Sequence, residues 1–328
     1  MDTSPVVIWV RNRFDLWNWP ASATAALQRQ FPAVEFLSPA TEAELLAVLP
    51  RARVLIAGTV PAGAKTPNLL WLHAPSAAVN QLLRPDWVAG PVRITNGREI
   101  HGHLVAEHAL AMMLAIARGL PEAVRAQSQR HWAQEEIWHG PLQPTELRGA
   151  TAVLAGLGAI GGELARLMKA MGMRVVAIRA RPQLGAGAAD EVHAPAELDA
   201  VLPGADYMVL ALPVTRESTT LLDARRLALL PPRACVVNVG RGSLIDEPAL
   251  TAALAAGRLR AAALDVFAHE PLAADSPLWA MRQVLIVPHL GSATARMWER
   301  QVELIAENLR RLAAGQPLLA EVDKQRGY

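Results

Sequence analysis

Three ionisable residues in the second half of the sequence each follow a short apolar segment by a few positions: Arg241, Glu270 and His289. A guanidinium can bind a carboxylate, an imidazole can donate a proton near neutral pH, and a carboxylate can tune that imidazole. Reduction of a 2-keto acid needs these three groups. Each residue alone also has a structural interpretation, as a turn arginine, a loop glutamate before proline and a satisfied loop histidine.

A glycine-rich turn precedes these residues. In AVLAGLGAIGGELARLM, Gly156, Gly158 and Gly161 form the pattern G-x-G-x-x-G between an apolar segment and a helical pattern. The first glycine permits a tight turn, the second lets the backbone approach a pyrophosphate, and the third lets helix and strand pack closely. The helix N-terminus offers unpaired N–H groups to phosphates. The pattern predicts a dinucleotide site, although a packing turn without a ligand can have the same spacing.

Two arginines occupy the place where dinucleotide-binding domains usually carry an acidic residue. Arg179 lies 18 positions after Gly161, at the end of the apolar segment 174–178, and Arg181 follows two positions later. A carboxylate here repels a 2′-phosphate, whereas a guanidinium can bind that phosphate with two hydrogen bonds. We therefore predict NADP(H) as the cofactor. The alternative is a pair of solvated arginines at a strand end.

A framework of strands and helices must position these residues. Short segments that are apolar throughout alternate with helical patterns, which is typical of parallel sheets covered on both faces. We expect strands at 6–10, 34–37, 54–58, 69–73, 92–95, 151–158, 174–178, 207–212, 234–239, 261–266 and 284–288. We expect helices at 41–49, at 103–118, where a long apolar helix closes the first strand series, and at 294–313. The predicted fold class is α/β, with two doubly wound parallel-sheet domains whose ligands bind at the carboxyl ends of the strands.

Composition excludes several classes of protein. The chain has 328 residues, of which 52% are hydrophobic and 19% charged, so we expect two folded domains rather than a disordered chain. The net charge is only +2 and no basic block is present, so we predict no nucleic-acid partner. The apolar runs are shorter than a membrane span, and the single cysteine, Cys235, cannot form an internal disulfide. We expect a cytoplasmic protein without a membrane partner.

The segment HGHLVAEH is the other pattern that could do chemistry. His103 and Glu107 are four positions apart and would share one face of the predicted helix, and His101 and His108 flank them. A metal site needs a further ligand on that face, and none is evident. We therefore predict no metal.

The sequence as a whole resembles the D-isomer-specific 2-hydroxyacid dehydrogenases, and among them most closely the NADPH-dependent glyoxylate/hydroxypyruvate reductases. The resemblance covers nearly the whole chain, through the segments VAEHALAMMLAIAR, GLGAIG, LPVTRES, VVNVGRGSLID, ALDVFAHEPL, PHLGSAT and VDKQRGY. It implies that Arg241 binds the substrate, that His289 is the acid/base histidine and that Glu270 is its partner. It also implies that Asp265 holds the nicotinamide carboxamide.

The resemblance implies further residues of the site. The backbone amides of Ala77 and Ala78, in the loop HAPSAAVNQ, would bind the substrate carboxylate. Besides the glycines, the arginine pair and Asp265, the implied cofactor contacts are Ala159, Ile160, Leu212, Pro213, Ser218 and Val239.

The architecture implied by the resemblance is two Rossmann-like domains with a cleft between them. A flavodoxin-like substrate domain would comprise 1–99 and 297–328, and a dinucleotide-binding domain would comprise 100–296. A homodimer would form through the nucleotide domain and the polar, tryptophan-bearing arm at 121–148.

The function implied is NADPH-dependent reduction of a small 2-keto acid, of the glyoxylate/hydroxypyruvate type, to the D-2-hydroxy acid. Two alternatives stay open. One is the same chemistry on a bulkier acid, such as phenylpyruvate or phosphoglycerate. The other is a nucleotide-sensing scaffold that resembles the transcriptional co-repressors built on this fold. The near-neutral charge favours the enzyme.

Overall fold

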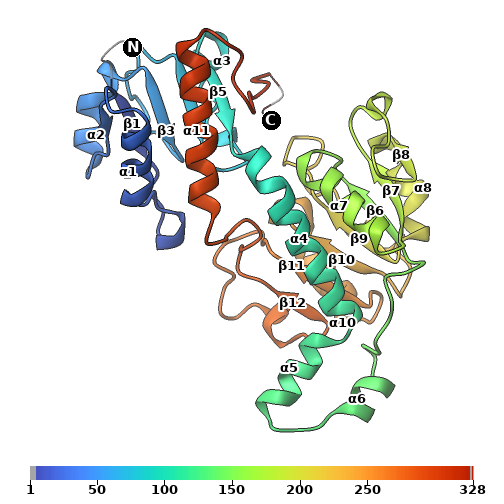
Figure 1. Ribbon diagram of the computed structural model, residues 1–328. Helices are drawn as coiled ribbons and strands as arrows, with labels where there is room; N and C mark the ends of the chain where they lie inside the picture. Colours follow the sequence, from blue (N-terminus) through green and yellow to red (C-terminus); the bar gives the residue numbers. More distant parts are fainter. Residues whose placement is uncertain (1–4, 326, 328) are drawn as a thin grey trace. The chain divides into compact units, whose positions relative to one another are not determined.

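The computed structural model describes residues 5–325 and 327, with the backbone alone at position 80. The chain divides into two compact units (Figure 1). The terminal unit comprises Met1–His101 and Ala293–Tyr328, and the central unit comprises Gly102–Ser292. The described segments 5–101 and 293–325 therefore belong to one folded unit.

A five-stranded parallel sheet forms the centre of the terminal unit, in the order β2-β1-β3-β4-β5. This is the order of flavodoxin-like doubly wound sheets. β3 and β4 are buried along their whole length, and the sequence accordingly shows nearly continuous apolar runs there. The strands are β1 (Val6–Trp9), β2 (Phe36–Leu37), β3 (Val54–Ala57), β4 (Trp71–Ala74) and β5 (Arg93–Asn96).

Helices cover both faces of this sheet, because alternate residues of each strand point to opposite sides. Val6 and Ile8 pack with α1 and α11, whereas Val7 packs with α2 on the other face. Figure 1 shows α1 and α11, the first and last α-helices of the chain, side by side over the sheet. The elements are α1 (Ala21–Gln30), α2 (Glu42–Val48), α3 (Pro85–Ala89), α11 (Met297–Ala313), and the 3-10 turns η1 (Asp15–Trp17), η2 (Leu49–Arg51) and η3 (Asn80–Leu82).

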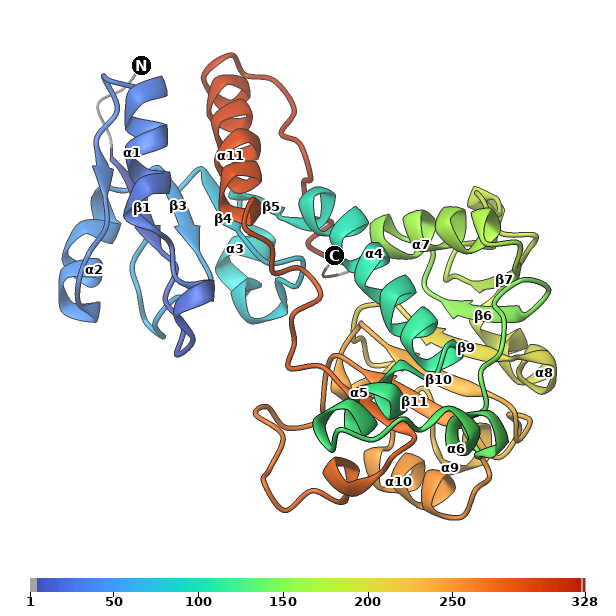
Figure 2. The same cartoon turned by 60° about the horizontal axis from the view of Figure 1, so that its bottom comes forward.

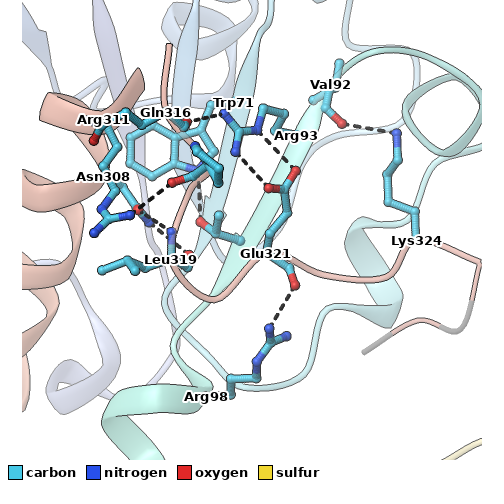
Figure 3. A network of polar contacts seen from close by, with 12 residues as sticks. Trp71, Val92, Arg93, Arg98, Asn308, Arg311, Gln316, Leu319, Glu321 and Lys324 are labelled. Atoms are coloured by element: carbon cyan, nitrogen blue, oxygen red, sulfur yellow. Dashed lines mark hydrogen bonds and ion pairs between the residues drawn. The ribbon is translucent and has the colours of Figure 1, made fainter. Parts of the chain in front are cut away.

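The C-terminal segment covers the β5 edge of this sheet (Figure 3). Residues 320–322 run antiparallel to β5 and exchange backbone hydrogen bonds of 3.2 and 2.8 Å with it. The Glu321 carboxylate accepts two hydrogen bonds from Arg93, at 3.1 and 2.8 Å, and its carbonyl accepts one from Arg98 at 2.8 Å. Lys324 donates to three backbone carbonyls of the same unit. The tail thus satisfies backbone groups that an edge strand leaves open.

The central unit contains a seven-stranded parallel sheet in the order β12-β11-β10-β9-β6-β7-β8. The chain starts at β6, winds outward through β7 and β8, and then crosses to β9 on the other side. The winding direction therefore reverses between β6 and β9, where doubly wound sheets bind dinucleotides. The strands are β6 (Thr151–Ala155), β7 (Arg174–Ile178), β8 (Glu191–His193), β9 (Tyr207–Leu210), β10 (Cys235–Asn238), β11 (Ala261–Leu264) and β12 (Val284–Ile286).

Different helices cover the two faces of the central sheet (Figure 2). α4 and α7 pack on one face, and α8, α9 and α10 pack on the other. The elements are α4 (Arg98–Ala117), α5 (Leu120–Ser128), α6 (Gln134–His139), α7 (Ala159–Ala170), α8 (Leu198–Val201), α9 (Ala224–Leu227), α10 (Glu247–Ala255), and the 3-10 turns η4 (Pro182–Leu184), η5 (Pro195–Glu197), η6 (Leu202–Gly204), η7 (Gly242–Leu244) and η8 (Pro277–Ala280).

Two apolar features of the structure, the helix α4 and the segment α5–α6, differ in their exposure. α4 is long and apolar enough to cross a membrane by length and composition, but 61% of its most apolar window is buried, as in a core helix. α5 and α6 instead form an arm that extends beyond the sheet of this unit (Figure 1). On the arm, Trp132 is 85% exposed and Trp138 is 55% exposed.

The predicted fold class is confirmed, with parallel sheets covered by helices in both units. The sequence does not predict β8, because this edge strand is short, half-buried and begins with a glutamate. The expectation from the strand pattern that the apolar helix 103–118 closes the first strand series is wrong, whereas the domain range 100–296 implied by the resemblance contains this helix. α4 begins at Arg98, and from Gly102 onward it belongs to the central unit, where Met112 and Met113 pack in the same cluster as α7.

Candidate active site

The glycine turn lies at the carboxyl end of β6, where the central sheet reverses its winding. Gly156 has a φ of +100°, and a Cβ there would lie 2.5 Å from the Ala211 carbonyl oxygen. A Cβ at Gly161 would lie 1.8 Å from the Gly156 carbonyl oxygen, so α7 can pack against the turn only with glycine. A Cβ at Gly158, by contrast, would meet no described atom within 4 Å. Two glycines therefore shape the turn, and the third borders open space.

This geometry fits a dinucleotide. α7 starts at Ala159, so the N–H groups of Ala159, Ile160 and Gly161 belong to its first turn and have no partner within the helix. The partial positive charge of a helix N-terminus favours phosphate at this place. The open space beside Gly158 is the place where a pyrophosphate could approach the backbone.

Arg179 and Arg181 lie just beyond β7. Arg179 is half-buried and its Nη1 donates to the Gly185 carbonyl at 2.8 Å, while Arg181 is exposed. Neither pairs with a carboxylate of residues 5–325 or 327, whereas Arg174, at the other end of the same strand, pairs with Glu191. The carboxyl end of β7 thus carries two positive charges without a described counter-ion.

The other predicted cofactor residues lie at the same edge of the sheet. Leu212 and Pro213 follow β9, across the reversal point from the glycine turn. Ser218 is buried, and its Oγ donates to the Pro213 carbonyl at 2.8 Å and accepts the Thr215 N–H at 2.7 Å, so it braces this loop from within. Val239 is buried directly after β10. Their contacts with a cofactor stay predictions.

Arg241, Glu270 and His289 follow β10, β11 and β12, which are neighbours in the central sheet. His289 Nδ1 lies 2.7 Å from Glu270 Oε2, and Glu270 Oε1 accepts the Phe267 N–H at 3.1 Å. Because Nδ1 faces a carboxylate, we assign the proton of the neutral ring to Nδ1. Nε2 then remains for a reacting group. Histidine and glutamate therefore form an oriented acid–base pair.

The groups around Glu270 favour its ionised form. Burial raises the pKa of Glu270, but the hydrogen bond to His289 and the charges of His289 and Arg241 outweigh it and hold that pKa below its ordinary value. Burial lowers the pKa of Arg241, and the negative charges of Glu270 and Asp265 oppose this change. Arginine stays charged in proteins. Its Nη1 donates to the Gly240 carbonyl at 2.6 Å.

Asp265, directly after β11, holds the loop that carries His289. Its backbone carbonyl accepts the His289 N–H at 2.9 Å, and its two carboxylate oxygens accept the N–H groups of Leu290 and Gly291 at 2.8 and 3.0 Å. These bonds stabilise His289 at a φ of +53°, a left-handed conformation that costs a residue with a side chain about 1 kcal/mol or more. The predicted contact of Asp265 with nicotinamide stays a prediction.

Sequence reasoning misses two residues of this framework. His108 of α4 places Nε2 3.2 Å from the buried Asp265 carboxylate. Asn238, at the end of β10, donates from Nδ2 to the Arg241 carbonyl at 2.9 Å and accepts the Gly240 N–H at 3.0 Å. The segment HGHLVAEH signals His108, but as a candidate metal ligand. No group of three or more histidine, cysteine, aspartate or glutamate side chains in the described ranges could hold a metal ion.

Ala77 and Ala78 lie in the terminal unit, in the loop between β4 and η3. Both are half-buried, and neither N–H donates to a group that the structure describes. Consecutive N–H groups of this kind can bind an anion. The loop therefore has the donors that the predicted carboxylate site requires.

Comparisons with known proteins agree with this arrangement. Residues 110–291 match the family described as "D-isomer specific 2-hydroxyacid dehydrogenase, NAD binding domain", and all of them lie in the central unit. D-3-phosphoglycerate dehydrogenase of Mycobacterium bovis is 35% identical over 301 residues, which are 90% of this chain and 55% of that protein. The chain thus spans about half the length of this relative.

Two solved structures extend the similarity to both units. A D-isomer specific 2-hydroxyacid dehydrogenase from Xanthobacter autotrophicus, in complex with NADPH and MES, is 31% identical with a TM-score of 0.82, covering 99% of this chain and 100% of that one. An NADPH-dependent glyoxylate/hydroxypyruvate reductase from Sinorhizobium meliloti, in complex with NADP and malonate, is 25% identical with a TM-score of 0.80, covering 99% and 98%. The chain therefore belongs to the D-isomer-specific 2-hydroxyacid dehydrogenase family of oxidoreductases.

Proposed function

We propose that this protein is an NADP(H)-dependent reductase that converts a small 2-keto acid of the glyoxylate/hydroxypyruvate type into the D-2-hydroxy acid. The pair of His289 and Glu270, on the sheet edge that also carries Arg241 and the glycine turn, is the observation on which this proposal depends. The similar reductase from Sinorhizobium meliloti supports the substrate class.

The residues divide the reaction between them. A bound NADPH supplies a hydride to the carbonyl carbon. Arg241 binds the carboxylate and the carbonyl oxygen of the substrate, so the charge that develops on this oxygen faces a cation. His289 donates a proton to the same oxygen from Nε2, and Glu270 stabilises the protonated ring through Nδ1. The amides of Ala77 and Ala78 bind the substrate carboxylate.

The residues at the carboxyl end of β7 would select NADP(H) over NAD(H). Arg179 and Arg181 bind the 2′-phosphate, because neither is neutralised by a described carboxylate. The first turn of α7 binds the pyrophosphate. The remaining cofactor contacts are proposed at Leu212, Pro213, Ser218, Val239 and Asp265.

A second candidate is the same chemistry on phosphoglycerate. The similarity to the Mycobacterium bovis phosphoglycerate dehydrogenase favours it, and the proposed catalytic residues would serve both substrates. The two candidates differ in the side chain of the acid, so a substrate panel separates them.

The arm supports a homodimer formed through the central unit. Its exposed apolar side chains are Leu120, Val124, Trp132 and Trp138, with exposed fractions of 50%, 62%, 85% and 55%. Apolar patches of this kind mark protein–protein interfaces. A dimer in light scattering that Val124→Glu converts to a monomer would support this part of the proposal. A cytoplasmic location also remains part of it.

A turnover panel tests the proposed function. NADPH and NADH oxidation is followed with glyoxylate and hydroxypyruvate, and the reverse reaction with D-3-phosphoglycerate. We expect the fastest turnover with NADPH and the small keto acids. His289→Ala should lose roughly 10²–10⁴-fold in kcat. His139→Ala is the control, because this histidine also pairs with a glutamate, at 3.3 Å, but lies on the arm.

Two results would contradict the proposal. A clear preference for D-3-phosphoglycerate would establish the second candidate. NADPH binding without turnover of any keto acid would favour a nucleotide-sensing scaffold.

A further inference from the structure

We propose that Gln301 of α11, together with His73 and Thr95, positions the loop 75–78 so that its amides can bind the substrate carboxylate. The inference rests on the proposed function and assigns positioning residues, of which Gln301 lies more than 200 positions from the loop in sequence. All of these residues belong to the terminal unit.

Three consecutive carbonyl groups of the loop are held by hydrogen bonds. The Pro75 carbonyl accepts Gln301 Nε2 at 2.6 Å and His101 Nε2 at 2.8 Å. The next carbonyl, of Ser76, accepts the Gly97 N–H at 3.1 Å. The Ala77 carbonyl accepts Asn96 Nδ2 at 2.7 Å. The donors come from the end of β5, the start of α4 and α11.

These bonds determine where the loop amides point. In a trans peptide the C=O of one residue and the N–H of the next point in opposite directions. Anchoring the carbonyls of Pro75, Ser76 and Ala77 therefore directs the N–H groups of Ser76, Ala77 and Ala78 away from the anchoring side chains. None of these three N–H groups donates to a described group.

The anchor at Pro75 is the end of a continuous hydrogen-bond chain. Trp71 Nε1 donates to Thr95 Oγ1 at 2.8 Å, and Thr95 Oγ1 lies 2.8 Å from His73 Nδ1. His73 Nε2 lies 3.1 Å from Gln301 Oε1, and Gln301 Nε2 donates to Pro75. Every group finds a complementary partner only if the neutral His73 ring carries its proton on Nε2.

The surroundings keep this chain neutral and rigid. Burial lowers the pKa of His73 to about 4, so the ring is uncharged at neutral pH and its tautomer is determined by its two partners. His73, Thr95 and Gln301 are at most 1% exposed. A Cβ at Gly97 would lie 2.2 Å from the Pro75 carbonyl oxygen and 2.8 Å from Gln301 Nε2, so glycine alone permits this approach.

A fully buried, fully satisfied polar chain can also serve stability alone, so the test separates the two roles. Gln301→Met keeps the length of the side chain and removes both of its hydrogen bonds. Thr95→Val, a milder change, interrupts the chain two steps earlier. Ile305→Val is the control, because Ile305 is buried one turn further along α11 and packs in an apolar cluster.

We expect Gln301→Met to raise KM for glyoxylate about tenfold, the effect of losing one hydrogen bond that orients the donors. The value of kcat and the Kd for NADPH should stay within about twofold, because neither depends on this loop. Thr95→Val should change KM in the same direction and add little in the double variant, since both act on one chain. Ile305→Val should lower stability without changing KM.

Binding of oxalate, measured by calorimetry, provides a readout that does not need turnover. A selective loss of oxalate affinity in Gln301→Met and Thr95→Val supports the inference, even if the wild type reduces no keto acid and the proposed function fails. Unchanged KM and oxalate Kd in both variants overturn the inference. Equal changes in Ile305→Val also overturn it, because the effect would then follow stability. If Gln301→Met does not fold, Thr95→Val decides.

Discussion

Replacing Glu270 by glutamine keeps the shape of the side chain and removes one negative charge 2.7 Å from His289 Nδ1. A hydrogen bond to a charged group contributes about 1.5–3 kcal/mol and a neutral one about 0.5–1.5 kcal/mol. The side chains of His289 and Glu270 are 42% and 31% exposed, so solvent screening reduces the difference to about 1 kcal/mol or less. Since one pH unit corresponds to about 1.4 kcal/mol, the pH dependence should move by about 0.7 unit or less.

The direction in which the pH profile moves follows from the protonation state of His289 that the reaction needs. Reduction needs a protonated histidine, so kcat/KM for reduction falls as pH rises, whereas kcat/KM for oxidation improves. In Glu270→Gln the protonated ring is less stable, and the alkaline fall of reduction should begin at lower pH. The assay is kcat/KM against pH in both directions. The control is Glu247→Gln, whose carboxylate accepts the Ala268 N–H at 3.0 Å and forms no hydrogen bond with His289 in the described part of the chain.

Two results would refute this reasoning. Superimposable profiles for wild type and Glu270→Gln would mean that the carboxylate does not tune the acid. An equal shift in Glu247→Gln would mean that the loss of any nearby negative charge moves the profile. The hydrogen bond between Glu270 and His289 would then not be its cause.

The remaining predictions concern the cofactor, the substrate and stability. The double variant Arg179→Asp, Arg181→Ala should lower the NADPH/NADH ratio of kcat/KM by roughly 10–100-fold, because a carboxylate that repels the 2′-phosphate replaces a guanidinium that binds it. An unchanged ratio would mean that the two arginines do not bind this phosphate. Arg241→Ala should lower kcat/KM for glyoxylate by roughly 10²-fold while the Kd for NADPH stays nearly constant; wild-type turnover would make this arginine a turn residue. Burial lowers the pKa of His73 from 6.5 to about 4, so the unfolded chain binds more protons between these values, and its contribution to the free energy of unfolding falls by about 3 kcal/mol from pH 7 to pH 4. Urea unfolding of His73→Gln should lose this part of the pH dependence, and parallel curves for variant and wild type would contradict the low pKa.

Local sequence patterns predict much of this fold. A buried parallel strand is apolar on both faces, so it can be recognised in the sequence without knowing which strands lie beside it. The segment 174–178 coincides with β7 for this reason. The glycine turn is visible for a similar reason. The constraints on Gly156 and Gly161 come from the turn itself and from Ala211 at the end of the adjacent strand. Where a strand is short and half-buried, as in β8, no such pattern exists.

The same reasoning explains why the strand pattern alone assigns the long apolar helix to the wrong unit. α4 has a hydrophobic composition nearly all round, so its pattern shows burial but not which sheet buries it. The choice is made by packing with α7, whose residues lie some 50 positions later in the sequence and share a core cluster with Met112 and Met113. Periodicity carries no information on such a partner.

Residues proposed to touch a reacting group can be recognised from sequence patterns more easily than the residues that hold them in place. His289 lies at a strand end, where polar residues are unusual and therefore visible. Asp265 holds the His289 loop through backbone N–H groups 25 and 26 positions away, and any loop sequence would offer those donors. His73 and Gln301 are 228 positions apart and meet only because the last helix of the chain packs on the first sheet. Sequence patterns therefore identify the groups proposed to do the chemistry, whereas the precision with which they are held depends on contacts that arise only when the whole unit has folded.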